Sequence, residues 1–236
     1  MSARLVVNAD DFGRSLGVNA GVVRAHAEGI LTSASLMVRY AASTAAAALA
    51  REHPGLGVGL HLDLGEWERC DDGWRASYEV VDTADRAAVE REVEGQIDRF
   101  IALVGRSPTH LDSHQHVHRD EPVRSAVADA ARSLGVPVRH GPGIRYCGGF
   151  YGQGRHGEPL PELIGAAALE RLIAALGDAA TELACHPAAA IDFPTAYAGE
   201  RLTELAALCD PGVARALRER EIRLCTFPDL GALPCA

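Results

Sequence analysis

The segment His110–His118, HLDSHQHVH, holds four histidines and one aspartate within nine residues. Imidazole and carboxylate groups are common ligands of zinc and other divalent metals. Because the histidines and Asp112 alternate along the chain, they would share one face of a strand. A strand rises about 3.3 Å per residue, so one or two of them can reach a single ion, and the others would orient ligands, bind substrate or hold the loop. A solvated metal-binding tract is the alternative, but the preceding PTHLDS favours the end of a strand.

Other acidic and imidazole side chains also follow predicted strands, at the point where each strand ends. The apolar runs at 4–9, 56–62 and 181–186 end in Asn8, Asp10, Asp11, His61, Asp63 and His186. In parallel α/β folds the carboxyl ends of the strands meet at one edge, where catalytic groups collect. Together with the histidine-rich segment, these residues are expected to line one rim of the fold.

Asp10 and Asp11 are adjacent, so on an extended chain their side chains point in different directions. One of them is expected to bind a metal while the other accepts a proton from water. Two carboxylates near one another would repel and one pKa would rise, but a divalent cation removes that conflict for its ligand. The alternative is that ADDFG is a turn that ends the strand and caps the next helix through Ser15.

His61 lies in an otherwise apolar run, LGVGLHLDL. A single histidine on a strand is more often a satisfied core residue than a metal ligand. The histidine-rich segment reverses that preference, since two histidines and an aspartate are a familiar set of ligands for zinc or another divalent metal.

Strand-like and helical segments alternate along the chain. Apolar runs of strand length are found at 4–9, 32–38, 56–62, 108–113, 135–140, 181–186 and 222–227. Helical periodicity is found at 17–29, 41–52, 85–105, 121–135, 160–177 and 199–209. This order predicts a parallel sheet covered by helical crossovers, and about seven such units fit an irregular (β/α) barrel. A doubly wound open sheet is the main alternative, and the segments 65–84 and 141–160 are predicted functional loops.

The composition narrows the functional class. The 236 residues are 47% hydrophobic and 23% charged, which fits one domain spanning 1–236. A net charge of −9 argues against nucleic acid as the partner, and no apolar run is long enough for a membrane span. The N-terminus has no secretory pattern, and the six cysteines form no CxxC pair, so a cytoplasmic protein without a disulfide framework is expected.

Several separated blocks resemble the YdjC-like carbohydrate deacetylase family, in the family's order and over nearly the whole chain. These blocks are VVNADDFG, GVNAGVVRAHAEGILTSASLMV, VGLHLDL, PTHLDSHQHVH and ELACHP. The resemblance implies an α/β barrel akin to polysaccharide deacetylases, a divalent metal, Mg²⁺ or Zn²⁺, and a homodimer. It also implies hydrolysis of N-acetylated sugars to acetate and an amino sugar. The substrate would be a sugar or oligosaccharide, with a chito-oligosaccharide branch and a hopanoid-type glycolipid branch both open.

The resemblance also implies roles for single residues. Asp11, His61 and His114 match the metal ligands, Asp10 matches the general base, and His186 matches the late histidine that acts as the acid. Second-sphere or substrate-binding roles are considered for Asp112, His116, His118, Tyr146, Phe150 and Tyr151, although the aromatic residues could equally pack within their loop.

Two other functional classes are compatible with such a rim. A metal-dependent phosphoesterase would need more cationic groups for phosphate, and the rim is expected to offer few beyond Arg14. A non-catalytic carbohydrate-binding protein would not need the adjacent aspartates together with His186.

Overall fold

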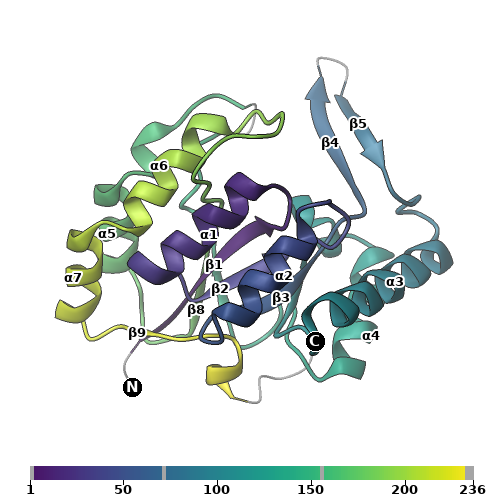
Figure 1. Ribbon diagram of the computed structural model, residues 1–236, viewed down its shortest axis with the longest axis horizontal. Coiled ribbons are helices and arrows are strands. Elements are labelled where there is room, and N and C mark those ends of the chain that lie inside the picture. The colour runs from purple at the N-terminus through teal and green to yellow at the C-terminus, as the bar shows by residue number, and fades with distance from the viewer. Residues whose placement is uncertain (1–2, 71–72, 155–156, 232–236) are drawn as a thin grey trace.

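The computed structural model describes residues 3–70, 73–154 and 157–231, and its centre is a parallel sheet (Figure 1). In sheet order the strands are β6 (Leu111–Ser113), β3 (Gly57–Leu62), β2 (Ser33–Leu36), β1 (Arg4–Phe12), β8 (Thr181–Cys185) and β7 (Arg145–Cys147). The short strand β9 (Arg223–Leu224) also pairs with β1. Every pairing in this sheet is parallel, so the carboxyl ends of its strands lie at one edge.

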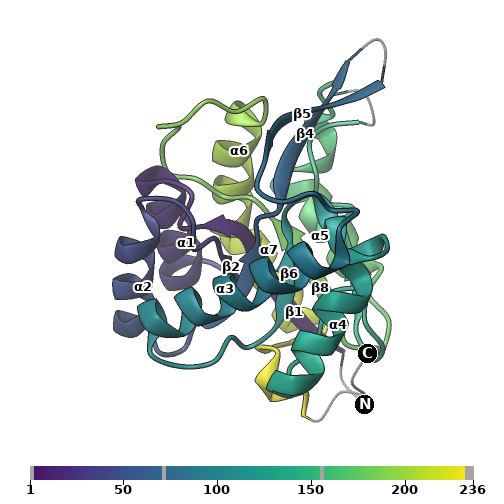
Figure 2. The ribbon, with the colours of Figure 1, turned by 90° about the vertical axis from the view of Figure 1, so that its right-hand side faces the viewer.

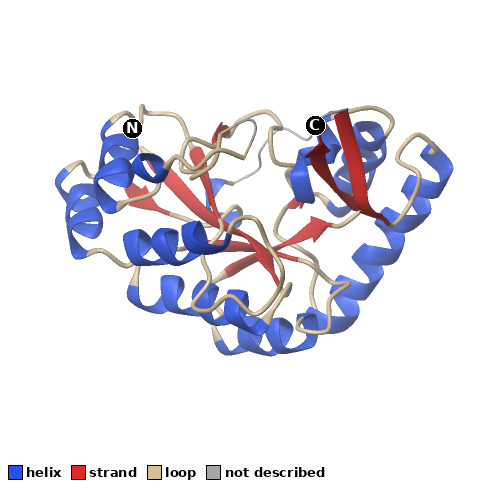
Figure 3. Cartoon of the chain, turned by 90° about the horizontal axis from the view of Figure 1, so that it is seen from above, coloured by secondary structure: helices blue, strands red, loops and turns tan. Residues whose placement is uncertain are grey.

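Helices form a continuous layer around the sheet. Their bounds are α1 (Leu16–Glu28), α2 (Ser43–Glu52), α3 (Arg86–Val104), α4 (Val123–Leu134), α5 (Ala166–Ala174), α6 (Ala198–Leu208) and α7 (Pro211–Glu219). Each helix of this layer contacts the next one: α7 contacts α5, α5 contacts α6, and α6 contacts α1. The contacts continue from α1 through α2 and α3 to α4, so the layer follows the sheet from end to end (Figure 3). Across the described residues, no helix is both long and apolar enough to cross a membrane.

The central strands are buried on both faces, as their nearly continuous apolar sequences predict for a parallel sheet. Every residue of β3 and β8 is buried, and β1 is buried from Leu5 to Phe12. Polar side chains on these strands are therefore out of contact with water, where each needs a partner or a ligand. The first turn of α1 is capped by Ser15, whose hydroxyl accepts the amide hydrogen of Val18 at 3.1 Å.

The prediction of an irregular α/β barrel is confirmed, in an open form whose described sheet ends at β6 and β7. The strand predicted at 135–140 is wrong, because this segment forms only an isolated bridge between Val138 and Leu111. Pro137 has no amide hydrogen to donate to a ladder, and the chain pairs later, as β7. The helix α7 lies in a segment for which no element was predicted.

The predicted loop at 65–84 contains an antiparallel hairpin of β4 (Gly65–Cys70) and β5 (Gly73–Glu79), which stands away from the body (Figure 2). Residues 71 and 72 lie outside the described part of the chain, as do residues 155 and 156 of the loop at 141–160. The side chain of Gln115 bonds to both backbone groups of Trp67, at 2.9 and 2.8 Å. These bonds tie the base of the hairpin to the histidine-rich segment.

Candidate active site

Parallel pairing brings the ends of β1, β3, β6 and β8 to one edge, where the predicted site residues meet. Asp11 Oδ1 lies 3.7 Å from His61 Nε2 and 3.5 Å from His114 Nδ1. Asp10 Oδ2 lies 3.8 Å from His186 Nε2. The structure therefore gathers Asp11, His61 and His114 at one point and places the pair of Asp10 and His186 next to it.

Asp10 and Asp11 point to different partners, and β1 is irregular here, since its register with β2 shifts between Ala9 and Phe12. Asp11 has a φ of 64°, the left-handed region that a residue with a side chain seldom adopts. Its carboxylate accepts a hydrogen bond from Arg201 Nη2 at 2.5 Å through Oδ2, while Oδ1 faces the two histidines. Asp11 Oδ1 and His61 Nε2 are buried and have no hydrogen-bond partner within the described chain.

These donors fit a divalent metal ion. Two ligands of a tetrahedral ion held at about 2.0–2.1 Å are separated by about 3.3 Å, close to the distances around Asp11 Oδ1. Another cluster of acids and imidazoles, formed by Asp10, His61 and Asp112, has a suitable spacing as well. Its two carboxylates are already engaged by Arg139, so the set of Asp11, His61 and His114 suits an ion better.

His61 is held in position by a buried chain of hydrogen bonds. Its Nδ1 lies 2.8 Å from Asp112 Oδ1, which directs Nε2 toward Asp11. Ser35 donates to Asp112 Oδ2 at 2.7 Å and contacts His110 Nε2 at 2.9 Å. The His110 ring occupies the space over Gly59, where any side chain would meet it at 2.3 Å. Such a support fixes which ring nitrogen of His61 is free, as is usual for histidines that bind metals.

The charges around His114 favour its protonated form when no ion is bound. Burial by itself would lower the pKa of His114, but the carboxylates of Asp11 and Glu66, at 3.5 and 3.7 Å from its ring nitrogens, outweigh it and raise the pKa to about 9. His61 also has a raised pKa, because Asp112 and Asp10 outweigh its burial. Both imidazoles must lose a proton before they can bind a metal.

Metal affinity is therefore expected to rise with pH. Below pH 9 a metal ion has to displace the proton of His114, so affinity should increase up to about tenfold per pH unit between pH 7 and 9 and then level off. Calorimetry in two buffers of different ionisation enthalpy should show at least one proton released per ion at pH 7. Glu66→Gln removes one partner of His114 and should move the rise to lower pH. An affinity that is constant from pH 7 to 9 would contradict this assignment.

Asp10 is anchored by Arg139, a residue 129 positions away in the sequence. Two guanidinium nitrogens of Arg139 donate to Asp10 at 2.7 and 2.6 Å, and the same group contacts Asp112 at 2.9 Å and Glu182 at 2.7 Å. Burial opposes ionisation of Asp10, but Arg139 and His61 outweigh it and lower the pKa of Asp10 to about 2. Asp10 is thus a fixed carboxylate at neutral pH.

His186 is positioned through its backbone rather than its ring. Its amide donates to Glu204 Oε2, and the hydroxyl of Tyr197 donates to Glu204 Oε1 at 2.5 Å. The ring is left with Nε2 toward Asp10 and Nδ1 buried without a partner among the described residues. Burial lowers the pKa of His186 to about 4, so the ring is neutral at rest.

The prediction that the whole HLDSHQHVH segment shares one face is wrong beyond Ser113. The strand β6 ends there, and a 3-10 turn, η1 (His114–Arg119), contains left-handed conformations at Gln115 and His116. This turn directs His118 away from Asp11. His118 contacts Ser113 Oγ at 2.6 Å and the carbonyl oxygen of Arg139 at 3.2 Å.

The aromatic candidates differ in how they are placed. Phe150 is 1% exposed and lies in the core, so of the two roles considered for it, packing and substrate binding, the structure shows packing. Tyr146 contacts His116 Nε2 through its hydroxyl at 3.1 Å. Tyr151 is 38% exposed, stacks on Tyr197 with ring centroids 4.6 Å apart, and lies 5.5 Å from the ring of His186. Of these three residues, Tyr151 is therefore the one suited to meet a sugar.

Sequence reasoning missed several residues of the site. The expectation of few cations beyond Arg14 is wrong, because Arg139 and Arg201 lie among the acidic groups. Arg139 lies at the end of the predicted strand 135–140 and could have been added to the rim by that rule. Nothing in the helical sequence marks Arg201 or Glu204. Arg139 is paired with Asp10 and Arg201 with Asp11, so a carboxylate balances the charge of each arginine.

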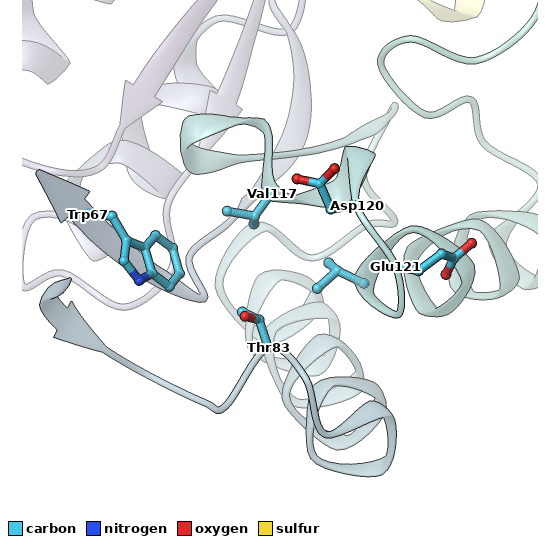
Figure 4. A pocket seen from close by; sticks show the side chains of 6 residues that line it. Trp67, Thr83, Val117, Asp120 and Glu121 are labelled. Atoms are coloured by element: carbon cyan, nitrogen blue, oxygen red, sulfur yellow. The ribbon is translucent and has the colours of Figure 1, made fainter. Parts of the chain in front are cut away.

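A small hollow lies beside the site, between the hairpin and η1 (Figure 4). Trp67 forms one wall and Val117 faces it from the turn, as Figure 4 shows. The hollow contains none of the residues of the candidate site. The described residues that line it are Trp67, Thr83, Val117, Asp120, Glu121 and Val123.

Known sequences match this chain over nearly its whole length. A family model described as YdjC-like protein matches residues 4–219. A carbohydrate deacetylase of Geobacillus stearothermophilus is 36% identical, and the alignment covers 94% of this chain and 96% of that protein. A chitooligosaccharide deacetylase of Enterobacter sp. (strain 638) is 34% identical, with 98% and 100% covered.

Solved structures share the fold. A protein of Enterococcus faecalis V583, described as a candidate cellobiose-phosphate cleavage protein, superposes with a TM-score of 0.80 at 23% identity and covers 98% of this chain and 99% of that one. A family 4 carbohydrate esterase from Streptomyces lividans, in complex with acetate, gives a TM-score of 0.55 at 14% identity, with 94% and 91% covered. At these identities the likeness concerns the fold alone.

Proposed function

Since the chain belongs to the YdjC-like family, we propose that it is a metal-dependent carbohydrate deacetylase that hydrolyses the amide of N-acetylated sugars to acetate and an amino sugar. The observation that carries this proposal is a pair of atoms able to bind a metal, Asp11 Oδ1 and His61 Nε2. Both are buried without a hydrogen-bond partner within the described part of the chain, and they lie beside the ionised Asp10. The phosphoesterase alternative is not favoured, because Arg139 and Arg201 are already paired with carboxylates.

Asp11, His61 and His114 would hold the divalent ion. When bound, such an ion supplies Lewis acidity, which polarises an amide carbonyl and makes a water molecule more acidic. Asp10 is ionised at neutral pH and fixed by Arg139, so it can accept the proton of the attacking water. Its Oδ2 faces His186 Nε2 at 3.8 Å.

The geometry gives the proton a route onward from Asp10. Arg139 lowers the pKa of Asp10 and burial lowers the pKa of His186, so at neutral pH Asp10 is ionised and His186 is neutral. The 3.8 Å between Asp10 Oδ2 and His186 Nε2 allows a proton taken up by Asp10 to pass to the ring. Protonated His186 can then donate to the nitrogen of the leaving amine. The resting enzyme needs no protonated histidine for these proton transfers, because the proton comes from water.

The test is an acetate-release assay on N,N′-diacetylchitobiose, N-acetylglucosamine conjugates and acetylated glycolipids. Acetate release is expected to stop when a chelator removes the metal and to return with added Mg²⁺ or Zn²⁺, which also identifies the active ion. A phosphate ester assayed in parallel should release no phosphate. A metal-loaded protein that releases no acetate from any of these substrates would contradict the proposal.

A chito-oligosaccharide is the substrate that the sequence relatives suggest, since their printed names include chitooligosaccharide deacetylase. We expect the protein to act as a cytoplasmic homodimer, as the family resemblance and sequence imply. The cysteines within the described residues are all free, which fits a reducing compartment. Light scattering on the purified protein tests the dimer.

Tyr151 is expected to contribute to sugar binding. Tyr151→Ala should raise KM by about three- to tenfold, the effect of losing one aromatic contact of about 0.5–1.5 kcal/mol, and leave kcat within about twofold. Tyr151→Phe keeps the ring and serves as the control, with KM close to that of the parent protein. Steady-state kinetics on the chitobiose substrate measures both constants. Equal loss of activity in the two variants would show that the hydroxyl, rather than the ring, is needed.

A further inference from the structure

A second group of imidazoles comes together beside the candidate active site. It consists of His116, His118 and His140, named here the histidine cluster, and it shares no residue with the set of Asp11, His61 and His114. The ring centroid of His140 lies 5.1 Å from that of His116 and 5.7 Å from that of His118. The ring centroids of His116 and His118 are 6.0 Å apart. One nitrogen of each ring can be chosen so that all three lie within 4.8 Å of one another.

This spacing is close to that of a three-histidine metal site. Three atoms at most 4.8 Å apart lie within about 2.8 Å of their common centre, and zinc binds imidazole nitrogen at about 2.0–2.1 Å. Each ring would therefore have to move by less than about 1 Å, which a small rotation of the side chain provides.

The cluster also has a ring nitrogen that is free to bind a metal. His116 Nδ1 is buried and makes no hydrogen bond with any described residue, while the hydroxyl of Tyr146 holds the other nitrogen at 3.1 Å. His118 Nε2 makes only a contact of 3.2 Å with the carbonyl oxygen of Arg139, which it could exchange for an ion. His140 is exposed and leaves the cluster open to solvent.

A path to His116 is visible as well. A cavity of about 430 Å³ beside η1 is lined by Gln115, His116, Arg119 and Asp120. The cavity brings solvent to one side of the His116 ring. Three imidazoles without a carboxylate suit zinc, copper or nickel and do not suit magnesium, which requires oxygen ligands.

We propose that the histidine cluster is a second metal site, selective for transition-metal ions, formed by His116, His118 and His140. An ion bound there joins η1, which carries His114, to the segment that carries Arg139, the anchor of Asp10. The site would therefore stabilise the part of the chain that holds the catalytic groups, without taking part in the reaction.

The experiment compares zinc stoichiometry in three single variants by elemental analysis after dialysis against a fixed concentration of free Zn²⁺. His140→Ala removes an exposed side chain, so the fold should be retained, and circular dichroism would verify this. The His140→Ala variant should bind one equivalent of zinc fewer than the parent protein. His61→Ala should keep the equivalent that belongs to the cluster. His53→Ala is the matched control, since His53 also pairs edge-to-face with another histidine, His26, at 5.9 Å but lies outside the cluster.

The difference between the parent protein and His140→Ala is the decisive quantity, and it does not depend on whether an ion binds at Asp11. If the proposed catalytic site held no ion, His61→Ala would match the parent protein while His140→Ala would still lose one equivalent. Zinc should also raise the melting temperature of His61→Ala, and adding His140→Ala to that variant should abolish the rise, whereas Mg²⁺ should have no such effect. Equal zinc binding by the parent protein and His140→Ala would overturn the second site.

Discussion

Replacing Asp10 by asparagine should lower kcat by roughly two to four orders of magnitude, the usual contribution of a positioned acid or base. The amide of asparagine has nearly the shape of the carboxylate but cannot take a proton from water. Metal binding should remain, because Asp11, His61 and His114 are unchanged. Elemental analysis and acetate release, measured on the same preparation, test both parts of this expectation.

The fold should tolerate Asp10→Asn. Arg139 is surrounded by three carboxylates, and it keeps Asp112 at 2.9 Å and Glu182 at 2.7 Å when Asp10 is neutralised. Burial already raises the pKa of Glu182 to about 7, so the loss of one negative charge nearby should favour its ionised form.

Two further aspartate variants complete the comparison. Asp11→Asn is expected to lose metal affinity, since it removes a charged ligand. Asp63→Asn is the matched control, because Asp63 is also buried at this edge of the sheet but bonds to Tyr78, and its turnover should stay close to normal. If Asp10→Asn loses the metal as well, the roles of the adjacent aspartates are exchanged or shared.

His186→Ala should also lower kcat on N-acetylated sugars by roughly two to four orders of magnitude, with the metal retained and KM little changed. In the proposed mechanism, the leaving amine receives its proton through the ring of His186. An activated acetyl ester has a leaving group that needs no proton, so its hydrolysis should fall much less. The ratio of the two rates, measured on one preparation, is the diagnostic quantity.

A structural role for His186 predicts a different pattern. If the ring only filled space beneath the site, the alanine variant would lose stability, and amide and ester hydrolysis would fall equally. A melting curve of the variant separates these cases. His26→Ala, a change in a partly buried histidine of α1 that bonds to the carbonyl oxygen of Leu31, is the control for the loss of an imidazole elsewhere.

The pairing of a low pKa at Asp10 with a neutral His186 explains how both residues can act without prior protonation. Arg139 lowers the pKa of Asp10, and burial lowers the pKa of His186, so at neutral pH the first is ionised and the second is neutral. A proton accepted from water by Asp10 can pass to Nε2 of His186, 3.8 Å away. Removing either partner breaks the transfer, which is why both variants are expected to have large effects.

Much of the site followed from the sequence because it depends on local order. The alternation of apolar runs and helical segments predicts a parallel sheet, and a parallel sheet gathers the ends of its strands at one edge. Asp10, Asp11, His61 and His186 each end such a run, so their common location needed no knowledge of side-chain contacts. The family resemblance, confirmed by the sequence comparisons, likewise rests on short local motifs.

Tertiary structure alone decided which partner each group meets. Arg139 reaches Asp10 across 129 positions, and Arg201 reaches Asp11 across 190, which no periodicity encodes. The end of β6 at Ser113 and the left-handed turn after it divide the histidine-rich segment, so that His114 faces Asp11 while His116 joins His140. An alternating sequence specifies faces only while the chain stays extended, and the packing of the turn against the neighbouring segments sets where that extension ends.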